Sequence, residues 1–282
     1  MSPIFDTDFT IEAKNENFPV GSCFLSKKIR PHIKSFYNFA RFADNIADHP
    51  ELSSKEKLKQ LDGFEETLMG KGAGDPTFRE AINMHESLKK SGVSSKHCRD
   101  LLCAFKQDAI KSRYHDWADL EAYCDLSAAP VGRYMLDLHG EHNMTYEKSD
   151  SLCLSLQIIN HLQDCKDDYQ TLDRVYLPLN WVSEAGLDLV DLNGKKTTPA
   201  LRRVLNWMLL GIGGHLNFSK SLPNNLQSVP LSIETSIIYQ IALKLFNKIK
   251  LNDPLSKRIE LSKPEYASCS ITGLTKGLIH RC

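Results

Sequence analysis

Two helix-like segments carry acidic residues at a spacing that suits metal-ion chemistry. In "FARFADNIAD", residues 39–48, Asp44 and Asp48 lie four positions apart and follow Arg41. Positions four apart share one face of a helix, because each residue turns the chain by about 100°. Most neighbouring residues are apolar, which predicts a half-buried helix. Carboxylates in such a helix are costly unless they are paired or bind a metal ion.

The second segment is "QIINHLQDCKDDYQ", residues 157–170, where Asn160, Asp164 and Asp168 recur at spacing four and Gln157 lies close to their stripe. Two such stripes facing each other would concentrate negative charge. Oxygen-only ligands select hard cations, here Mg²⁺ or Mn²⁺, which commonly bind substrate phosphates as well. A lone stripe of this kind is usually a solvated helix face, so spacing alone leaves both interpretations open.

Composition limits the class of protein. The chain has 282 residues, 41% of them hydrophobic, and equal numbers of basic and acidic residues, 35 of each, so no basic excess indicates nucleic-acid binding. Its eight cysteines form no C-x-x-C pair, which favours reduced thiols in a cytoplasmic protein. The N-terminus lacks a signal peptide, and no stretch approaches the roughly 20 apolar residues of a membrane span. An apolar substrate would be met at the membrane surface.

Apolar periodicity predicts an all-α protein with a single domain over residues 1–282 and a loose tail over 265–282. No sustained alternation requires a sheet, and no internal repeat is present. "DRVYLP" is expected to leave the second acidic helix, because Pro178 stops regular structure. The expected helices cover residues 31–48, 53–69, 77–91, 95–112, 117–140 with an interruption near Pro130, 149–171, 198–220 and 230–250.

Both acidic segments resemble the signature motifs of the squalene/phytoene synthases, which join prenyl diphosphates head to head. "YNFARFADNIAD" and "QIINHLQDCKDDYQTLDRVYLP" carry the resemblance, which extends from about Asn15 to Pro178. "ENFPV", "FKQD", "PVGR" and Gln163 before Asp164 resemble the hydroxysqualene synthase branch of hopanoid biosynthesis. The resemblance implies the all-α isoprenoid synthase fold, with a helical bundle around a central cavity. It also implies conversion of presqualene diphosphate and water to hydroxysqualene and diphosphate.

The resemblance also implies roles for individual residues. Asp44, Asp48, Asn160, Asp164 and Asp168 would ligate Mg²⁺. Aromatic rings beside a carbocation would stabilise it by about 0.5–2 kcal/mol each. The remaining implied residues are Arg41, Lys111, Arg113, Gln157 and Arg174 near the diphosphate, Tyr37 and Tyr123 near the reacting carbons, and Phe18 and Tyr176 lining the site.

Two positions depart from the family pattern. Asn45 replaces the second aspartate often found in "DD..D", which removes one negative charge from the first motif. Six residues lead from Asp168 to Arg174, one more than the family pattern, so the resemblance leaves open whether Arg174 and Tyr176 reach the site.

Other functions stay open at the level of sequence. The chain could instead join two farnesyl diphosphates to presqualene diphosphate, or make squalene or phytoene. No NADPH is expected, because "GIGGH", residues 211–215, follows a helix-like run and is no dinucleotide fingerprint. A non-catalytic assembly factor of the same fold is a further alternative. Replacing Asp44 and Asp164 by alanine would separate that role, which should survive, from catalysis, which should not.

Overall fold

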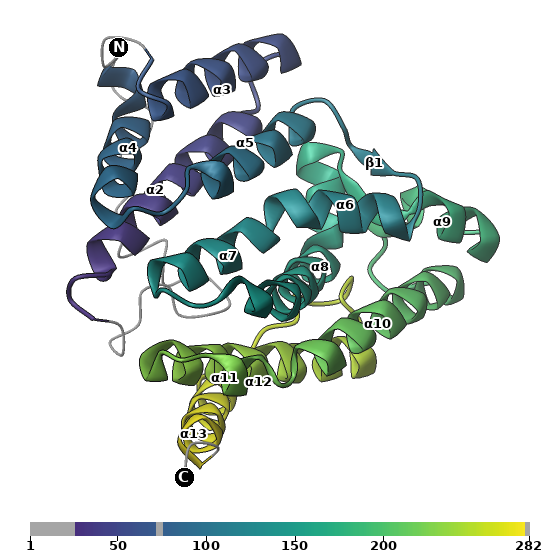
Figure 1. Cartoon of the computed structure of the whole chain (residues 1–282). Helices are drawn as coiled ribbons and strands as arrows, with labels where there is room; N and C mark the ends of the chain where they lie inside the picture. The colour runs from purple at the N-terminus through teal and green to yellow at the C-terminus, as the bar shows by residue number, and fades with distance from the viewer. Residues whose placement is uncertain (1–25, 72–75, 280–282) are drawn as a thin grey trace.

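The computed structural model describes residues 26–71 and 76–279, and most of these residues are helical. Figure 1 shows a bundle in which α8 runs through the middle and the other helices surround it. The main elements are α2 (Arg30–Ala47), α3 (Ser54–Leu68), α4 (Arg79–Ser91), α5 (Lys96–Asp108), β1 (Arg113–Tyr114), α6 (Trp117–Ser127), α7 (Ala129–Leu138), α8 (Tyr146–Leu172), β2 (Val175–Pro178), α9 (Leu179–Ala185), α10 (Pro199–Ser219), α11 (Leu222–Asn225), α12 (Val229–Leu251) and α13 (Lys263–Ile279). Short 3-10 turns cover Pro76–Phe78, Asn143–Thr145 and Leu189–Asn193. The all-α prediction is confirmed.

A smaller core packs α2 against α3, α4 and α5. Phe39 of α2 is fully buried, and its ring stacks on that of Phe64 from α3 with centroids 4.9 Å apart. A capping box begins α3, since Ser53 accepts from the Glu56 N–H and Glu56 accepts from the Ser53 N–H. This packing holds α2 rigidly, and α2 carries the first acidic motif.

The larger core surrounds α8, which packs against α6, α7, α10 and α12. Ile158, Ile159 and Leu162 are fully buried in its second half. Because α8 meets neighbours on several sides, apolar residues surround most of its circumference there. Its acidic stripe must then lie on the side where α2 and β2 leave room.

The predicted interruption near Pro130 separates α6 from α7. Ala128 lies at the break with φ −120° and ψ −48°, and Pro130 falls in the first turn of α7, where its missing N–H costs nothing. The break turns α7 along α8, against which it packs closely. Gly132 makes this approach possible, because a Cβ there would lie 2.3 Å from Ser149 Oγ and 2.7 Å from Cys153 Sγ.

The strands β1 and β2 pair in parallel, an element that the sequence did not predict. The Val175 N–H donates to the Ser112 carbonyl at 2.9 Å. Asp173 ends α8 in the left-handed region with φ 50°. This turn reverses the chain directly after α8 and places the residues of β2 beside the end of α5.

The segment 265–279, expected to be loose, forms most of α13 and packs along α12. A Cβ at Gly273 would lie 2.5 Å from Ile237 Cα, and one at Gly277 would lie 3.1 Å from Ile233 Cα. These two glycines, four residues apart, therefore let the backbones approach closely. Sequence periodicity is weak in this segment because the contact depends on missing side chains rather than on an apolar stripe.

Among the described residues, α12 is the one helix long and apolar enough to cross a membrane by length and composition. In its most apolar window, 61% of residues are buried inside the protein. The helix is covered by α8, α10, α11 and α13, as expected for a core helix.

Candidate active site

The first acidic stripe lies on α2 and faces the middle of the bundle. Arg41 Nη1 donates to Asp44 Oδ2 at 2.8 Å. The pKa of Asp44 is raised to about 7. Burial is the largest cause and the nearby Asp48 carboxylate is the next, whereas Arg41 lowers the pKa. Asp44 is therefore protonated in part at neutral pH.

The second stripe lies on α8, and its charges act on those of α2. The pKa of Asp168 is raised to about 7. Burial is the largest cause, the Asp164 carboxylate comes next, and Asp48 of α2 acts in the same direction. Arg258, from the segment after α12, donates to Asp164 through Nε at 2.5 Å and Nη2 at 3.0 Å. The two acidic stripes are thus close enough to repel each other, as the sequence predicted.

Arg174 lies between the two stripes, despite the extra residue that precedes it. Its side chain is buried, and its Nη1 lies 2.6 Å from Asp48 Oδ1. Its Nη2 also donates to the Asp108 carbonyl at 3.0 Å. The left-handed turn at Asp173 accommodates the additional residue, because α8 continues to Leu172 before the chain reverses.

Asp108, at the end of α5, was missed by the motif analysis. Its carboxylate accepts from Tyr123 Oη at 2.9 Å and from Tyr176 Oη at 3.5 Å. Burial raises the pKa of Asp108 to about 6, although Arg174 and the two tyrosines lower it. The available sequence signal was Asp108 itself, which ends the segment "LLCAFKQD" shortly after a run of apolar residues. Its role was hidden because its partners come from β2 and α6.

His161 of α8 is a second residue that the motif analysis missed. Its ring stacks on that of Tyr176 with centroids 3.5 Å apart. The pKa of His161 is lowered to about 3, first by burial and then by the Arg174 guanidinium, so the imidazole is neutral. The ring contacts Gln157 Nε2 at 3.2 Å, and its Nδ1 lies 4.0 Å from Asp168 Oδ2. His161 therefore links the aromatic group to the acidic one.

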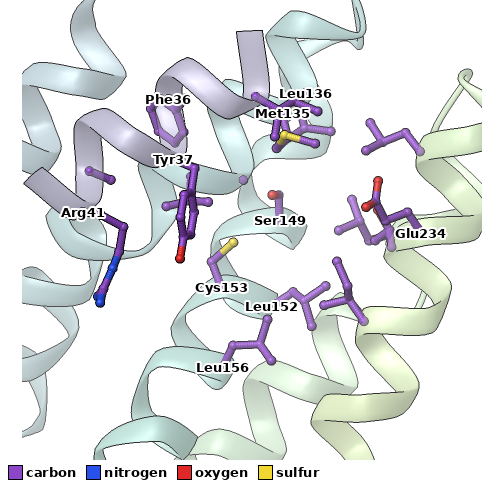
Figure 2. A pocket seen from close by; sticks show the side chains of 18 residues that line it. Phe36, Tyr37, Arg41, Met135, Leu136, Ser149, Leu152, Cys153, Leu156 and Glu234 are labelled. Carbon is purple, nitrogen blue, oxygen red and sulfur yellow. The ribbon is translucent and has the colours of Figure 1, made fainter. Parts of the chain in front are cut away.

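An apolar cavity of about 280 Å³ begins beside this acidic group. Figure 2 shows Arg41 and Tyr37 of α2 on one side of it and Glu234 of α12 on the other, with Ser149 and Cys153 of α8 between them. Most of its lining is hydrophobic: Ile33, Phe36, Ala40, Val131, Gly132, Met135, Leu136, Leu152, Leu156, Leu222, Leu231 and Ile238. The arrangement joins a charged end to a water-excluding chamber, which fits a molecule with an anionic head and a long hydrocarbon body.

The donor set of the two stripes fits a hard divalent cation. No group of three or more His, Cys, Asp or Glu residues that could hold a metal ion is found in residues 26–71 and 76–279. Arginines instead engage Asp44, Asp48 and Asp164. Burial first, and then the neighbouring carboxylates, nevertheless hold the pKa values of Asp44 and Asp168 above their ordinary range despite these arginines. Oxygen donors in that state suit Mg²⁺.

Three predicted site residues either pair with residues outside the two stripes or lie outside the described residues. Lys111 Nζ donates to Asp119 at 2.6 Å and lies over the ring of Tyr114, while Arg113 Nη2 pairs with Asp173 at 2.6 Å. The ion pairs of Lys111 and Arg113 are thus with Asp119 and Asp173 and not with aspartates of the two stripes, and their predicted place near the diphosphate stays a prediction. Phe18 lies outside the described residues.

Tyr123, Tyr176 and Tyr114 form one aromatic group, with ring centroids 5.2–5.7 Å apart. Tyr37 lines the cavity one turn from Arg41, as predicted. Tyr123 and Tyr176 thus lie against the Asp108 carboxylate, whereas Tyr37 lies in the wall of the cavity.

Comparisons with known proteins agree with this geometry. A family model described as squalene/phytoene synthase matches residues 11–265. The chain is 40% identical to a hydroxysqualene synthase of Rhodopseudomonas palustris, covering 95% of this chain and 91% of that protein. It is 39% identical to one of Sinorhizobium fredii, covering 89% and 85%.

Solved structures share the fold. A squalene synthase from Alicyclobacillus acidocaldarius superposes with a TM-score of 0.70 at 25% identity, covering 82% of this chain and 87% of that chain. A dehydrosqualene synthase superposes with a TM-score of 0.80 at 19% identity, covering 95% and 94%. The motifs, the paired acidic helices and these matches agree: the chain belongs to the squalene/phytoene synthase family.

Proposed function

We propose that this protein is a hydroxysqualene synthase, which converts presqualene diphosphate and water to hydroxysqualene and diphosphate. One observation carries the proposal: relatives of that name share 35–40% identity over about nine-tenths of the chain. The site supports it, because carboxylates and arginines lie beside an apolar cavity. Membership of this family supports the coarser statement that the protein is an enzyme acting on prenyl diphosphates.

Asp44, Asp48, Asn160, Asp164 and Asp168 are proposed to hold Mg²⁺. When bound, the metal ion supplies Lewis-acid stabilisation of the charge that develops on the departing diphosphate. The oxygen donors of these side chains come from two facing helices, and they would suit a hard divalent cation. Mn²⁺ suits the same donors.

The arginines hold the diphosphate in this scheme. Arg41 and Arg174 already lie against Asp44 and Asp48 at 2.8 and 2.6 Å. From these positions the two guanidinium groups would donate to phosphate oxygens, which arginine can bind with two parallel hydrogen bonds. Arg258 on Asp164 is placed to act in the same way.

The aromatic residues protect the cation that remains after diphosphate leaves. The faces of Tyr37, Tyr123 and Tyr176 can each stabilise it by about 0.5–2 kcal/mol. Asp108 fixes two of the hydroxyl groups, since Tyr123 and Tyr176 both donate to it. The apolar walls exclude bulk water, so that a single positioned water molecule adds to the cation.

Incubation of the purified protein with presqualene diphosphate and Mg²⁺ tests the proposal. Without NADPH, the expected product is a C30 alcohol whose oxygen comes from isotopically labelled water. Absence of that alcohol would overturn the proposal. Formation of presqualene diphosphate from farnesyl diphosphate would instead support the function of a relative from Zymomonas mobilis, which is 29% identical over 76% of this chain and is named presqualene diphosphate synthase.

Contact with a membrane surface is proposed for loading and release, because substrate and product are long hydrocarbons. Exposed apolar side chains such as Leu210 and Phe218 of α10 are 75% and 48% accessible. Sedimentation with phospholipid vesicles would measure this contact, and recovery of all the protein in the supernatant would count against it.

A further inference from the structure

Residues 252–262, here called the strap, connect α12 to α13 and contain neither helix nor strand. Asp253 fixes the start of the strap, because its carboxylate accepts from the Thr197 N–H at 2.8 Å and from the Thr197 hydroxyl at 2.5 Å. Leu255 and Ile259 are buried in the larger core. The strap is therefore packed against the bundle, although its backbone is irregular.

Arg258 is the residue by which the strap meets the second acidic stripe. Its Nε and Nη2 donate to the two carboxylate oxygens of Asp164 at 2.5 and 3.0 Å, and its Nη1 donates to Glu260 at 2.9 Å. The Arg258 side chain is 40% exposed. An exposed ion pair holds a fixed geometry only weakly, because water competes for both charges and a long side chain loses entropy. The position of Arg258 therefore depends on what holds the backbone of the strap.

Gln163 of α8 holds that backbone. It directly precedes Asp164, only 3% of its surface is exposed, and its Nε2 donates to the Ile259 carbonyl. This partner sets the orientation of the amide, because a carbonyl oxygen can only accept. Gln163 thus binds Ile259, and the next residue of α8 binds the preceding residue of the strap. A buried carbonyl that loses its donor is costly, so this contact resists separation of the strap from α8.

Gln170 provides a comparison on the same helix. Its Nε2 donates to Asn193 Oδ1 at 3.0 Å, so it also joins α8 to a segment between longer helices. Gln170 and Asn193 are both exposed, and the turn Leu189–Asn193 contains no arginine. Gln163 differs because it is buried and because the segment that it holds places a guanidinium group against the acidic stripe.

We propose that Gln163 is a positioning residue for the diphosphate group of the substrate. Its bond to the Ile259 carbonyl sets the strap so that Arg258 presents its guanidinium at the acidic end of the site. The inference rests on the proposed function, in which Arg258 is placed to hold the diphosphate. It adds a residue that acts through Arg258 and touches no substrate itself.

A guanidinium group that is already fixed binds a diphosphate more tightly than a mobile one. Ordering a long side chain, and the segment that carries it, costs free energy during binding, and a strap that is held in advance avoids this cost. Loss of the Gln163 bond should therefore weaken binding of the diphosphate. This contact is made in the bound substrate before the C–O bond ionises, so its loss should appear in KM more than in kcat.

Gln163→Met tests the proposal, because methionine has a similar length and volume and lacks the amide donor. Calorimetric titration with inorganic diphosphate in the presence of Mg²⁺ should show binding about tenfold weaker than in the wild type. Gln170→Met is the matched control and should bind within about twofold of the wild type, since it changes an exposed residue away from the strap.

A double-mutant cycle shows whether Gln163 acts through Arg258. Arg258→Met should itself weaken diphosphate binding by about tenfold or more. Adding Q163M to Arg258→Met should weaken binding no further, because the strap then has no guanidinium to position. An equal loss from Q163M in both backgrounds would overturn the inference. Unchanged binding in either single variant would overturn it as well.

Steady-state kinetics with presqualene diphosphate separate positioning from a loss of folded enzyme. In Q163M, KM should rise about tenfold and kcat should stay within about threefold of the wild type. A fall in kcat with unchanged KM would overturn the inference, because a purely structural defect lowers the fraction of active protein. Trypsin should cleave after Lys257 or Arg258 faster in Q163M and at the wild-type rate in Q170M, since release of the strap exposes its backbone.

Gln163→Asn keeps an amide donor at a shorter reach and should give intermediate diphosphate affinity and KM. It decides the matter where Q163M does not fold, and wild-type values in Gln163→Ala together with Gln163→Asn would refute the positioning role. Failure of the wild-type protein to make any C30 alcohol would refute the proposed function instead, whereas the diphosphate affinities would still decide the role of Gln163.

Discussion

The acidic side and the apolar side of the site treat charge in opposite ways. On the acidic side, Asp44, Asp48 and Asp164 each lie within 3 Å of an arginine nitrogen. On the apolar side, Glu234 lies in a wall of hydrocarbon. Dense pairing allows several carboxylates and guanidinium groups to lie close together at the end of the site where we propose that the ionic part of the substrate binds. The apolar side instead suits the hydrocarbon body of a substrate, because most of its wall consists of hydrophobic side chains.

The largest expected effect comes from breaking the acidic side. Asp44→Ala or Asp164→Ala should lower kcat by about a thousandfold or more, because metal ions would lose ligands that stabilise the departing diphosphate. Steady-state diphosphate release measures the effect, and circular dichroism checks the fold. Asp167→Ala is the matched control, since that aspartate is exposed on the same helix. Near-normal activity in both motif variants would refute the metal-binding assignment and leave an assembly role open.

The acidic side was also the part that sequence analysis predicted best. Spacing four in two apolar segments placed Asp44, Asp48, Asp164 and Asp168 on facing helices, because helical periodicity is local. Arg174 could not be placed from spacing, since its position depends on the left-handed turn at Asp173 and on pairing with a strand of two residues.

The apolar side was less predictable. Leu231 and Ile238 read as ordinary core positions, and nothing local distinguishes a residue that lines a cavity from one that fills it. Glu234 stood in an apolar helix without a second acid at helical spacing, so the motif search passed over it. Helix α13 was missed because its contact with α12 depends on Gly273 and Gly277, which let the two backbones approach and leave no apolar stripe in the sequence.

Narrowing the cavity should break the apolar side while the acidic side stays intact. In Gly132→Ala the new Cβ would meet Ser149 Oγ at 2.3 Å and Cys153 Sγ at 2.7 Å, so these two side chains of the cavity wall or α7 itself must shift. The free energy of unfolding should fall by about 1–3 kcal/mol, and kcat/KM by about tenfold to a hundredfold.

The control for this variant is Gly214→Ala in α10, where a Cβ meets nothing within 4 Å. It should raise the free energy of unfolding by up to about 1 kcal/mol through helix propensity. Urea unfolding and substrate titration measure both variants. Equal behaviour of the two would show that the close α7–α8 contact does not shape the cavity.

A smaller effect is expected at the junction of the two sides. Tyr123→Phe removes the hydroxyl that donates to Asp108 at 2.9 Å and should lower kcat by about threefold to tenfold. Tyr146→Phe is the matched control, because the Tyr146 hydroxyl donates to Asp137 away from the site. Product analysis by mass spectrometry should show altered proportions only in Tyr123→Phe. Unchanged yield and product identity would exclude a role for this hydroxyl in the chemistry.

The smallest expected effect concerns protons and metal ions on the acidic side. The folded-state pKa values of Asp44 and Asp168 are raised from 3.8 to about 7. Between those pH values the folded protein holds protons that the unfolded chain releases, so the metal-free protein loses stability as pH rises to about 7. Mg²⁺ must displace the same protons.

Added Mg²⁺ should therefore raise Tm by about 2–4 °C more at about pH 8 than at about pH 6. Thermal unfolding with and without Mg²⁺ measures the difference. Asp44→Asn should flatten it and should raise the metal-free Tm at the higher pH, because the variant lacks one of the two carboxylates whose pKa is raised. A Mg²⁺ effect of equal size at both pH values would contradict the view that the acidic side stores protons in place of metal ions. The apolar cavity would be unaffected by that result, since neither Asp44 nor Asp168 lines it.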